Sequence, residues 1–436
     1  MNSNVPGVEQ RDPQYFGYYA MLQHQQNMLQ DTVRTSTYRS AILLNGPNNF
    51  KNKKILDVGS GSGILSYFAV QAGAEKVYAV EASGMANKMK KLVTAASKDG
   101  KNVFLKDKIE VVNAKIEDPA LSIPRVDTII SEPIGVLLFH ERMLESYIHA
   151  RDHYLKPGGA LFPSKGNIYL APFTDAVLWS ETMGKARFWQ QQSFYGIDLT
   201  SLYKDACDEM FGMPVVGHFD PHSLITTPTA LNGFPVDFST VTIQELQDIT
   251  MPFAWTAQYT GLIHGIAGWF DLVFAPPPYD QTDAANVDTV VEMSTGPAAE
   301  RTHWQQVRFL FKEPLAVNAG QKIRGWMRCI VNDMRSYTIY IEATTLDSQV
   351  LSDPTTLGKG DTFKEASDNS PLLRRGVWEL HEQTYNYSYT PGMATEHVPE
   401  QSCLYEPESY QNSTAHSQVI AIEAMNVMDN YEDFVN

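Results

Sequence analysis

Two glutamates, Glu132 and Glu141, flank a stretch that contains Pro133 and Gly135 and are the first candidates for chemistry in this sequence. Proline and glycine favour a loop, on which the two carboxylates could converge. Such a pair could bind a metal ion, share a proton as acid and base, or hold a cation. A metal ion is the less favoured choice without a nearby cluster of His and Asp. A guanidinium fits best, because its planar N–H donors match carboxylates in pairs.

A glycine-rich turn, LDVGSGSGI at residues 56–64, is the strongest local motif. An apolar strand runs into this turn, and the turn opens a helix. Glycine is needed there because the backbone must bend sharply and let a ligand approach without a Cβ. The dinucleotide pattern GxGxxG would require glycine at position 64, where this chain has Ile64. The observed GxGxG spacing is more typical of an S-adenosylmethionine loop.

Glu81 ends the next predicted strand, twenty residues after Gly61. At that place an acidic side chain can accept hydrogen bonds from both hydroxyls of a ribose. The plain alternative is a solvated carboxylate at the end of a strand. The glycine turn and the spacing together favour the ribose role.

Alternating strands and helices must position these side chains. Strands are predicted at 53–59, 76–82, 109–114 and 126–131, with helices at 64–72 and 84–97. This order predicts a mostly parallel, doubly wound sheet. Ligands of such sheets bind at the carboxyl ends of the strands, so the loop with both glutamates should open beside the glycine turn.

Four segments are expected along the chain. Residues 1–50 are predicted to be mainly helical, and 51–162 to form the parallel-sheet domain. Residues 163–346, rich in aromatic strands with Pro and Gly, predict an antiparallel barrel or sandwich. Within them, 174–212 predict a helical arm whose apolar side chains bind a partner. Residues 347–436 lack periodicity and predict an acidic, mostly disordered tail.

Composition limits the possible partners. The net charge of −16 argues against nonspecific binding of nucleic acid and suits a cationic partner. No apolar run is long enough to span a bilayer, and no signal peptide is recognisable, so no membrane is expected. Three widely spaced cysteines form neither a disulfide framework nor a zinc knuckle. We therefore expect a soluble protein of the cytosol or nucleus.

Several motifs, in order from about residue 13 to 345, resemble those of the protein arginine methyltransferases. They are YFGYY at 15–19, DTVRTSTY at 31–38, the glycine turn, the SEPIG…ERMLE loop at 131–145, and THW at 302–304. The coactivator-associated subgroup is the most similar. The resemblance implies an α/β plus β fold: a Rossmann-like domain that binds S-adenosylmethionine, a β-barrel substrate domain, and a helical dimerisation arm inserted in the barrel. The N-terminal helices would close over the cofactor.

The resemblance also assigns roles to residues of this sequence. Glu132 and Glu141 resemble the clamp on the substrate guanidinium, and Tyr19 and Trp304 resemble residues of the substrate pocket. Asp31 and His303 resemble a pair that joins the N-terminal helices to the barrel and helps remove the last proton. The positions that match cofactor-binding residues are Tyr15, Phe16, Gln25, Met28, Arg34, Gly59, Gly61, Glu81, Ser83 and Glu117. Of these, Arg34 would meet the cofactor's carboxylate and Glu117 its adenine. No metal is implied.

The activity implied is transfer of methyl groups from S-adenosylmethionine to arginine, with S-adenosylhomocysteine as by-product. Met28 and the His303 loop resemble the enzymes that make asymmetric dimethylarginine (type I). Substrates would be histones and RNA- or transcription-associated proteins, the assembly a homodimer, and the location nucleus and cytoplasm. Ile134 and Val136 depart from the family's usual residues and could alter substrate preference.

Two other classes of function stay open on the sequence. The chain could be a non-catalytic scaffold whose acidic tail recruits basic partners. It could instead methylate small molecules or nucleic acid, although the net charge and the paired glutamates weigh against that reading.

Overall fold

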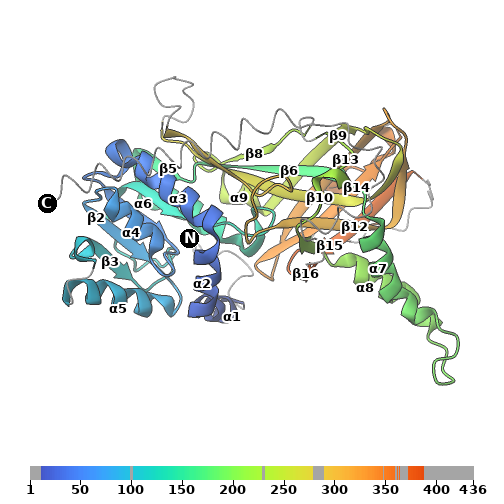
Figure 1. Cartoon of the computed structure of the whole chain (residues 1–436), viewed down its shortest axis with the longest axis horizontal. Coiled ribbons are helices and arrows are strands. Elements are labelled where there is room, and N and C mark those ends of the chain that lie inside the picture. The colour runs from blue at the N-terminus through green and yellow to red at the C-terminus, as the bar shows by residue number, and fades with distance from the viewer. Residues whose placement is uncertain are drawn as a thin grey trace, which may run out of the picture.

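The computed structural model describes residues 11–98, 102–227, 231–277, 289–346, 348–358, 361, 363 and 372–386. Everything below concerns this part of the chain. Two lobes lie side by side, an α/β lobe from the first part of the chain and a β lobe from the second (Figure 1). The N-terminal helices lie between them, and a helical arm projects from the β lobe.

Three helices begin the described chain: α1 (Asp12–Tyr19), α2 (Leu22–Gln30) and α3 (Thr32–Leu44). The Asp31 carboxylate caps α3 by accepting a hydrogen bond from the backbone N–H of Arg34, which satisfies one of the unpaired donors at a helix start. A π-helical turn (Gly46–Phe50) then leads to the first strand. Helices thus occupy most of residues 12–50, the described part of the segment expected to be mainly helical, and residues 1–10 lie outside the described residues.

The α/β lobe is built on a five-stranded, all-parallel sheet with the order β3-β2-β1-β4-β5. Its strands are largely apolar, as expected for a sheet covered on both faces. The strands are β1 (Lys54–Val58), β2 (Lys76–Val80), β3 (Ile109–Val112), β4 (Val126–Ser131) and β5 (Leu155–Phe162). The helices are α4 (Ile64–Gln71), α5 (Met85–Lys98) and α6 (Met143–Tyr154), with short 3-10 turns at Val103–Leu105 and His140–Arg142. The predicted Rossmann-like domain is confirmed.

The β lobe contains two sheets that face each other as a barrel-like structure, and their strands are antiparallel except that β16 runs parallel to β7. The larger has the order β16-β7-β12-β10-β6-β8, with β11 beside β10, and the smaller has the order β15-β14-β13-β9. Their bounds are β6 (Lys165–Phe173), β7 (Val215–Gly217), β8 (Phe234–Asp237), β9 (Asp248–Thr256), β10 (Gly261–Phe274), β11 (Val291–Ser294), β12 (Gln306–Val317), β13 (Lys322–Asn332) and β14 (Ser336–Thr344). A short helix, α9 (Ile243–Gln247), precedes β9.

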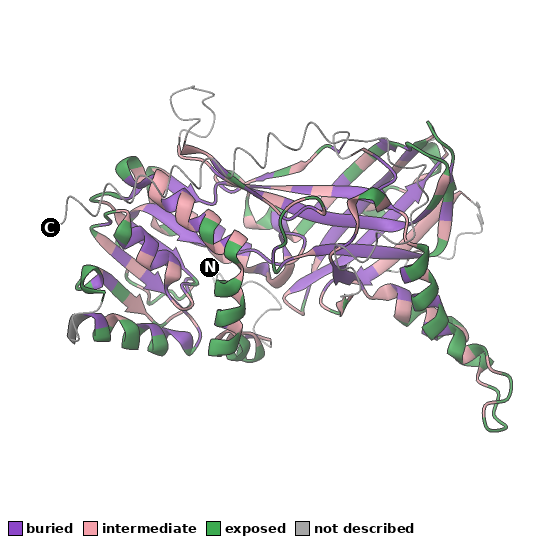
Figure 2. Cartoon of the chain, in the orientation of Figure 1, coloured by how far each residue is buried: buried purple, intermediate pink, exposed green. Residues whose placement is uncertain are grey.

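The helical arm consists of α7 (Ala176–Arg187) and α8 (Tyr203–Gly212), joined by 3-10 turns at Phe188–Gln190 and Thr200–Leu202. It is inserted between β6 and β7, where the sequence predicted it. Figure 2 shows that its outer end is mostly exposed, in contrast to the buried strands of the β lobe.

The end of the β lobe differs from the prediction. Residues 347–436 were expected to be a mostly disordered tail, but β15 (Leu373–Glu379) pairs with β14, and β16 (Thr384–Tyr385) pairs with β7. The Trp378 ring is buried against Phe309 and Phe311. The sequence around β15 is polar and shows no strand pattern of its own. The strand depends on pairing and packing with other segments of the chain. Residues 387–436 lie outside the described residues.

Among the described residues, no helix is both long and apolar enough to cross a membrane.

Replacing Trp378 by alanine should lower the free energy of unfolding by about 3–5 kcal/mol, because it leaves a large cavity between β15 and β12. The matched change Tyr385→Ala, at an exposed position of the same C-terminal segment, should cost less than about 0.5 kcal/mol. Chemical denaturation followed by circular dichroism would compare the two. Equal unfolding midpoints would contradict the placement of β15 in the barrel.

Candidate active site

A cavity of about 980 Å³ lies where the two lobes and the N-terminal helices meet. Its walls come from α1, α2, the glycine turn, the loop after β4, and the hairpin between β13 and β14. The volume suits a molecule of nucleoside-conjugate size together with one extended side chain. Fourteen of the sixteen predicted site residues line it: Tyr15, Phe16, Tyr19, Gln25, Met28, Arg34, Gly59, Gly61, Glu81, Glu117, Glu132, Glu141, His303 and Trp304.

The remaining two predicted residues, Asp31 and Ser83, do not line the cavity but contact residues that do. The Ser83 backbone N–H donates to Glu81 Oε1 over 2.7 Å, and the Gly61 N–H donates to Glu81 Oε2 over 2.8 Å. Each oxygen of the Glu81 carboxylate is thus oriented by the backbone yet keeps further acceptor sites. This arrangement is suited to accept two hydroxyl groups.

Glycine is required at positions 59 and 61 because of the backbone conformation and because other side chains lie close to the backbone there. Gly59 and Gly61 have φ of +67° and +53°, where residues with a side chain are strained. A Cβ on Gly59 would lie 2.0 Å from the Met143 methyl group, and one on Gly61 would lie 2.8 Å from Gln25 Oε1. The Gln25 amide oxygen in turn accepts from Ser62 N–H over 3.0 Å. The turn therefore leaves an open space at Gly59 and Gly61, called here the glycine cradle, that a side chain at either position would fill.

Arg34 and Glu132 form a direct ion pair inside the cavity. Nε and Nη2 of Arg34 donate to one oxygen of Glu132 over 3.2 and 2.7 Å. Both side chains are largely buried, with 7% and 12% exposure. The two had separate roles in the sequence analysis, the cofactor carboxylate for Arg34 and the substrate for Glu132. Because a guanidinium has five N–H donors and this pair uses two, Arg34 can still bind another anion.

Glu141 lies at a strained point of the backbone, with φ of +73° in the left-handed region. Its Oε2 accepts a hydrogen bond of 2.7 Å from the Tyr19 hydroxyl. Burial raises the pKa of Glu141 above its usual range, and the charge of Glu132 raises it further. Hydrogen bonds from Tyr19 and Tyr15 and the cation of Arg335 act in the opposite direction. The two glutamates thus influence each other across one cavity.

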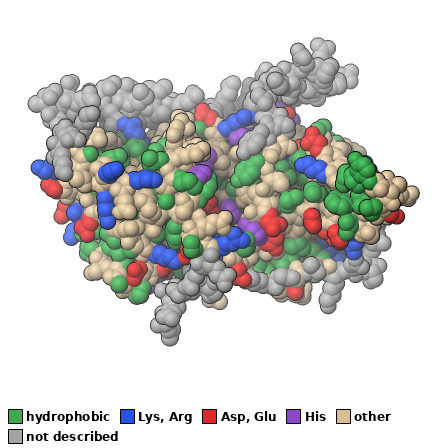
Figure 3. All heavy atoms as spheres, turned by 90° about the horizontal axis from the view of Figure 1, so that it is seen from below, with side chains coloured by type: hydrophobic (Ala, Val, Ile, Leu, Met, Phe, Trp, Pro, Cys, Tyr) green, Lys and Arg blue, Asp and Glu red, His purple; other side chains and the backbone are tan. Residues whose placement is uncertain are grey.

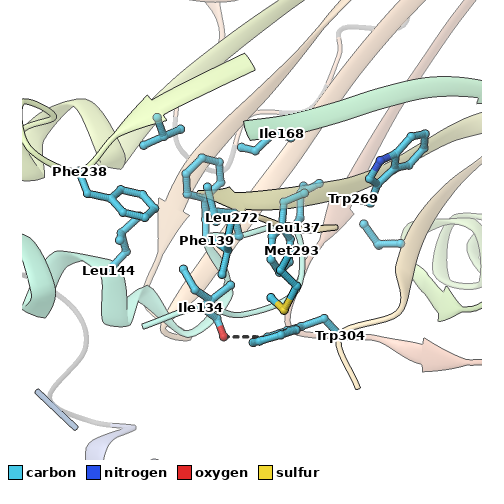
Figure 4. Close-up of a cluster of buried hydrophobic side chains, with 14 of the residues drawn as sticks. Ile134, Leu137, Phe139, Leu144, Ile168, Phe238, Trp269, Leu272, Met293 and Trp304 are labelled. Atoms are coloured by element: carbon cyan, nitrogen blue, oxygen red, sulfur yellow. Dashed lines mark hydrogen bonds between the residues drawn. The ribbon is translucent and has the colours of Figure 1, made fainter. Parts of the chain in front are cut away.

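The β lobe holds the loop that carries these glutamates. The Trp304 indole N–H donates to the Ile134 carbonyl over 3.0 Å, and its ring is buried against Phe270. Figure 4 shows Ile134, Leu137 and Phe139 of the loop packed among barrel side chains such as Met293. Trp304, expected to bind substrate, lines the cavity and also holds the loop through this hydrogen bond.

A second buried pair anchors the far end of the loop. Arg142 Nε and Nη2 donate to the two oxygens of Glu145 over 2.6 and 3.1 Å, and both side chains are 2% exposed. Arg142 also has a positive φ of +56°. The pair fixes the start of α6, next to the strained backbone of Glu141.

Asp31 joins the N-terminal helices to the β lobe. Its Oδ2 accepts from the His303 backbone N–H over 2.8 Å and lies 2.7 Å from His303 Nδ1. These hydrogen bonds hold the pKa of Asp31 below its usual value although partial burial acts against them. Asp31 does not itself line the cavity, but it contacts His303 and Arg34, which do. The predicted pairing of the two is present.

Glu117 and Met28 complete the predicted set. The Ser146 hydroxyl, at the start of α6, donates to Glu117 Oε1. Met28 lines the wall formed by α2. Glu117 thus lies in the wall of the same cavity as Glu81.

The sequence analysis missed several cavity residues. His140 lines the wall with Nδ1 2.8 Å from Ser336 Oγ, and burial lowers its pKa to about 4. Arg335 and His381 approach from the β lobe. Nothing in the local sequence marks these three, because their positions depend on strand pairing between distant segments.

Comparison with known families points to a single class. Residues 164–343 match a model described as the arginine methyltransferase oligomerization subdomain, and residues 41–131 match one described as ribosomal protein L11 methyltransferase (PrmA). The first covers the β lobe and its arm, and the second covers most of the parallel sheet.

Relatives and solved structures point to the same class of arginine methyltransferases. A probable histone-arginine methyltransferase CARM1 of Oryza sativa subsp. indica is 44% identical over 328 residues, 75% of this chain and 58% of the relative. The histone-arginine methyltransferase CARMER of Drosophila yakuba is 43% identical over 77% of this chain and 60% of the relative. The structure of Arabidopsis thaliana protein arginine methyltransferase 10 superposes with a TM-score of 0.67 at 29% identity, over 84% of this chain and 100% of that one.

The fold and the site therefore define a methyltransferase-type protein with a parallel-sheet domain and a barrel. The chain belongs to the protein arginine methyltransferase family. It spans about three fifths of the length of the curated relatives that it matches.

Replacing Glu145 by glutamine should lower the free energy of unfolding by about 3–5 kcal/mol, because Arg142 is left buried without a counter-ion. In the control Asp152→Asn, on the same helix, a pair between the exposed Asp152 and Arg151 is lost, and the cost should stay below about 1 kcal/mol because Arg151 keeps its hydrogen bonds to two backbone carbonyls. Thermal and chemical unfolding of both variants would test this. A similar small cost for both would show that the buried pair does not anchor the loop.

Proposed function

We propose that this protein is an S-adenosylmethionine-dependent protein arginine N-methyltransferase. The observation that carries the proposal is the pair Glu132 and Glu141 in one cavity with the glycine cradle and Glu81. A nucleoside cradle beside two carboxylates suits a sulfonium donor and a guanidinium acceptor. Membership of the arginine methyltransferase family supports the same reading.

The residues present fit the cofactor. Gly59 and Gly61 leave space that any Cβ would fill, and the oriented Glu81 carboxylate can accept from both ribose hydroxyls. Glu117 would contact the adenine, and Arg34 would pair with the carboxylate of the methionine part. The related Trypanosoma brucei PRMT1 enzyme–prozyme complex contains AdoHcy, which supports this assignment. When bound, S-adenosylmethionine supplies an electrophilic methyl group on a cationic sulfur.

The two glutamates would bind and polarise the substrate arginine. A guanidinium is protonated at neutral pH, so its nitrogens are poor nucleophiles. Two carboxylates on one side draw the positive charge toward the nitrogens they bind, which leaves electron density on the nitrogen that faces the donor. Holding that nitrogen in line with the methyl group supplies much of the remaining acceleration.

Asp31 and His303 would help to remove the final proton. The Asp31 carboxylate fixes His303 Nδ1, which leaves the other ring nitrogen available to accept a proton. His303 is partly exposed, so that the proton can pass to solvent. Asp31 acts here as a positioning residue.

The product and the substrates are the finer part of this proposal. Met28 beside the His303 loop favours asymmetric dimethylation (type I) with monomethylarginine on the way. The relatives named as histone-arginine methyltransferases favour histone tails as substrates and action in the nucleus. RNA- and transcription-associated proteins would be further substrates, and some of the protein would act in the cytoplasm.

The arm would hold two copies of the chain together as a homodimer. Exposed apolar side chains gather along it, and in Figure 3 hydrophobic side chains cluster toward the end of the face where the arm lies in Figure 1. They are Val177, Phe188, Tyr195, Ile197 and Leu202. Patches of this kind on an otherwise acidic protein favour a protein partner.

Replacing Glu141 by glutamine should reduce methyl transfer to a histone H3 tail peptide by about a hundredfold or more, because the clamp loses its charge. S-adenosylhomocysteine should still bind, since Glu141 is not part of the cradle. Mass spectrometry would follow methylated products, and calorimetry would measure the binding.

The control is Glu110→Gln, at an exposed glutamate of β3 that pairs with Lys76. It should leave both measurements unchanged. Wild-type turnover in Glu141→Gln would refute the clamp. A wild-type protein that neither binds S-adenosylhomocysteine nor methylates the peptide would refute the proposed function and favour a scaffold.

Replacing Tyr19 by phenylalanine should move the acid limb of the pH–rate profile to higher pH. Glu141 must be ionised to bind a guanidinium, so the rate falls as the pH drops through its pKa. The Tyr19 hydroxyl lowers that pKa, and its removal therefore raises it. The neighbouring Tyr18→Phe, at an exposed position on the same helix, should leave the limb in place. An unshifted or downshifted limb in Tyr19→Phe would contradict this.

A further inference from the structure

Asp12, at the start of α1, is bound by cations from both lobes. Its carboxylate pairs with Lys115, which follows β3 in the α/β lobe, and with Arg335, on the β13–β14 hairpin of the β lobe. Asp12 is 7% exposed, so its charge needs compensation from partners rather than from water. An acidic residue in the first turn also suits the helix dipole.

The same two cations contact the aromatic face of α1. The Arg335 guanidinium lies 4.2 Å from the centroid of the Tyr15 ring and 5.8 Å from that of Phe16. Lys115 Nζ lies 5.7 Å from the Phe16 centroid on its own side. Helix α1 is thus held between the lobes by charge and by cation–π contacts.

Apolar burial contributes little to holding this helix. Among the residues of α1, all of which the structure describes, Asp12 alone is buried. An eight-residue helix is not stable by itself, so tertiary contacts decide whether it stays in place. Since its apolar burial is small, polar contacts carry much of that task, namely those of Asp12 and the hydrogen bond from Tyr19 to Glu141. Elements of this kind are the ones that open locally.

We infer that Asp12, Lys115 and Arg335, named here the α1 clasp, are positioning residues that control the opening of α1 and so the exchange of cofactor. This inference rests on the proposed function, because α1 forms a wall of the cavity in which the cofactor would lie. The clasp joins that wall to both lobes. Breaking it releases α1 without removing any group from the cradle.

The test measures the dissociation rate of S-adenosylhomocysteine from the full chain by stopped-flow fluorescence. Asp12→Asn keeps the size of the side chain but leaves two cations facing each other. It should speed dissociation about tenfold, as loss of a partly buried charge pair does. The KM for S-adenosylmethionine should rise while kcat at saturation stays near the wild-type value. Added salt should speed dissociation from the wild type more than from the variant.

Arg335 variants separate charge from stacking. Arg335→Met should match Asp12→Asn in the dissociation rate, although its kcat should also fall because Arg335 supports Glu141, whereas Arg335→Lys keeps the charge but not the flat contact with Tyr15 and should restore part of the slow dissociation. The double variant Asp12→Asn/Arg335→Met should be no faster than either single variant, because both break the same contact.

The matched control is Asp248→Asn, which removes the same kind of charge from a pair with Arg328 on the barrel. It should leave the dissociation rate unchanged. Thermal unfolding would check that each variant is folded, and Lys115→Met provides the same test from the exposed side of the clasp.

The outcomes are distinct. A wild-type rate in both Asp12→Asn and Lys115→Met, in a protein that binds S-adenosylhomocysteine, would overturn the clasp and leave the proposed function standing. Equal acceleration by Asp248→Asn would also overturn it, because the effect would be one of general charge. Failure of the wild type to bind S-adenosylhomocysteine would overturn the proposed function and the clasp with it.

Discussion

A buried carboxylate is the constraint around which this site is organised. Glu141 lies at a left-handed backbone position inside a cavity, close to a second carboxylate. A buried anion is costly unless donors surround it. The hydroxyl of Tyr19 and the cation of Arg335 supply that support, while Arg34 offsets the charge of Glu132. A bound guanidinium would complete this balance.

This balance requires groups from both lobes. The α/β lobe positions the cradle, Glu81 and Glu132 at the carboxyl ends of parallel strands, as expected for such sheets. The β lobe supplies Trp304, which holds the loop, and Arg335, which contacts the N-terminal helix. Neither lobe alone would form the cavity. Helix α1 lies between the two and contributes aromatic side chains to the wall, so its attachment affects cofactor and substrate together.

Much of this could be predicted from local sequence. Four of the five parallel strands, the helices α4 and α5 and the arm begin and end within a few residues of their predicted bounds, because apolar periodicity and glycine turns act over short stretches, whereas β5 was not predicted. The C-terminal strand β15 could not be predicted, since Arg374 and Arg375 interrupt its apolar pattern and its stability comes from Trp378 packing on β12. Likewise, local sequence carries no sign that His140 meets Ser336 from a distant strand.

The sequence by itself determined the residue types and their order: a glycine turn, an acid at the next strand end, and two glutamates around a loop. These features are local, because they depend on backbone conformation and on the chemistry of single side chains. Only the tertiary structure decided which charges meet. It pairs Arg34 with Glu132, uses Trp304 to hold the loop, and brings Arg335 to Asp12. Electrostatic energies depend on distance and burial, and both are set by how the two lobes pack rather than by spacing along the chain.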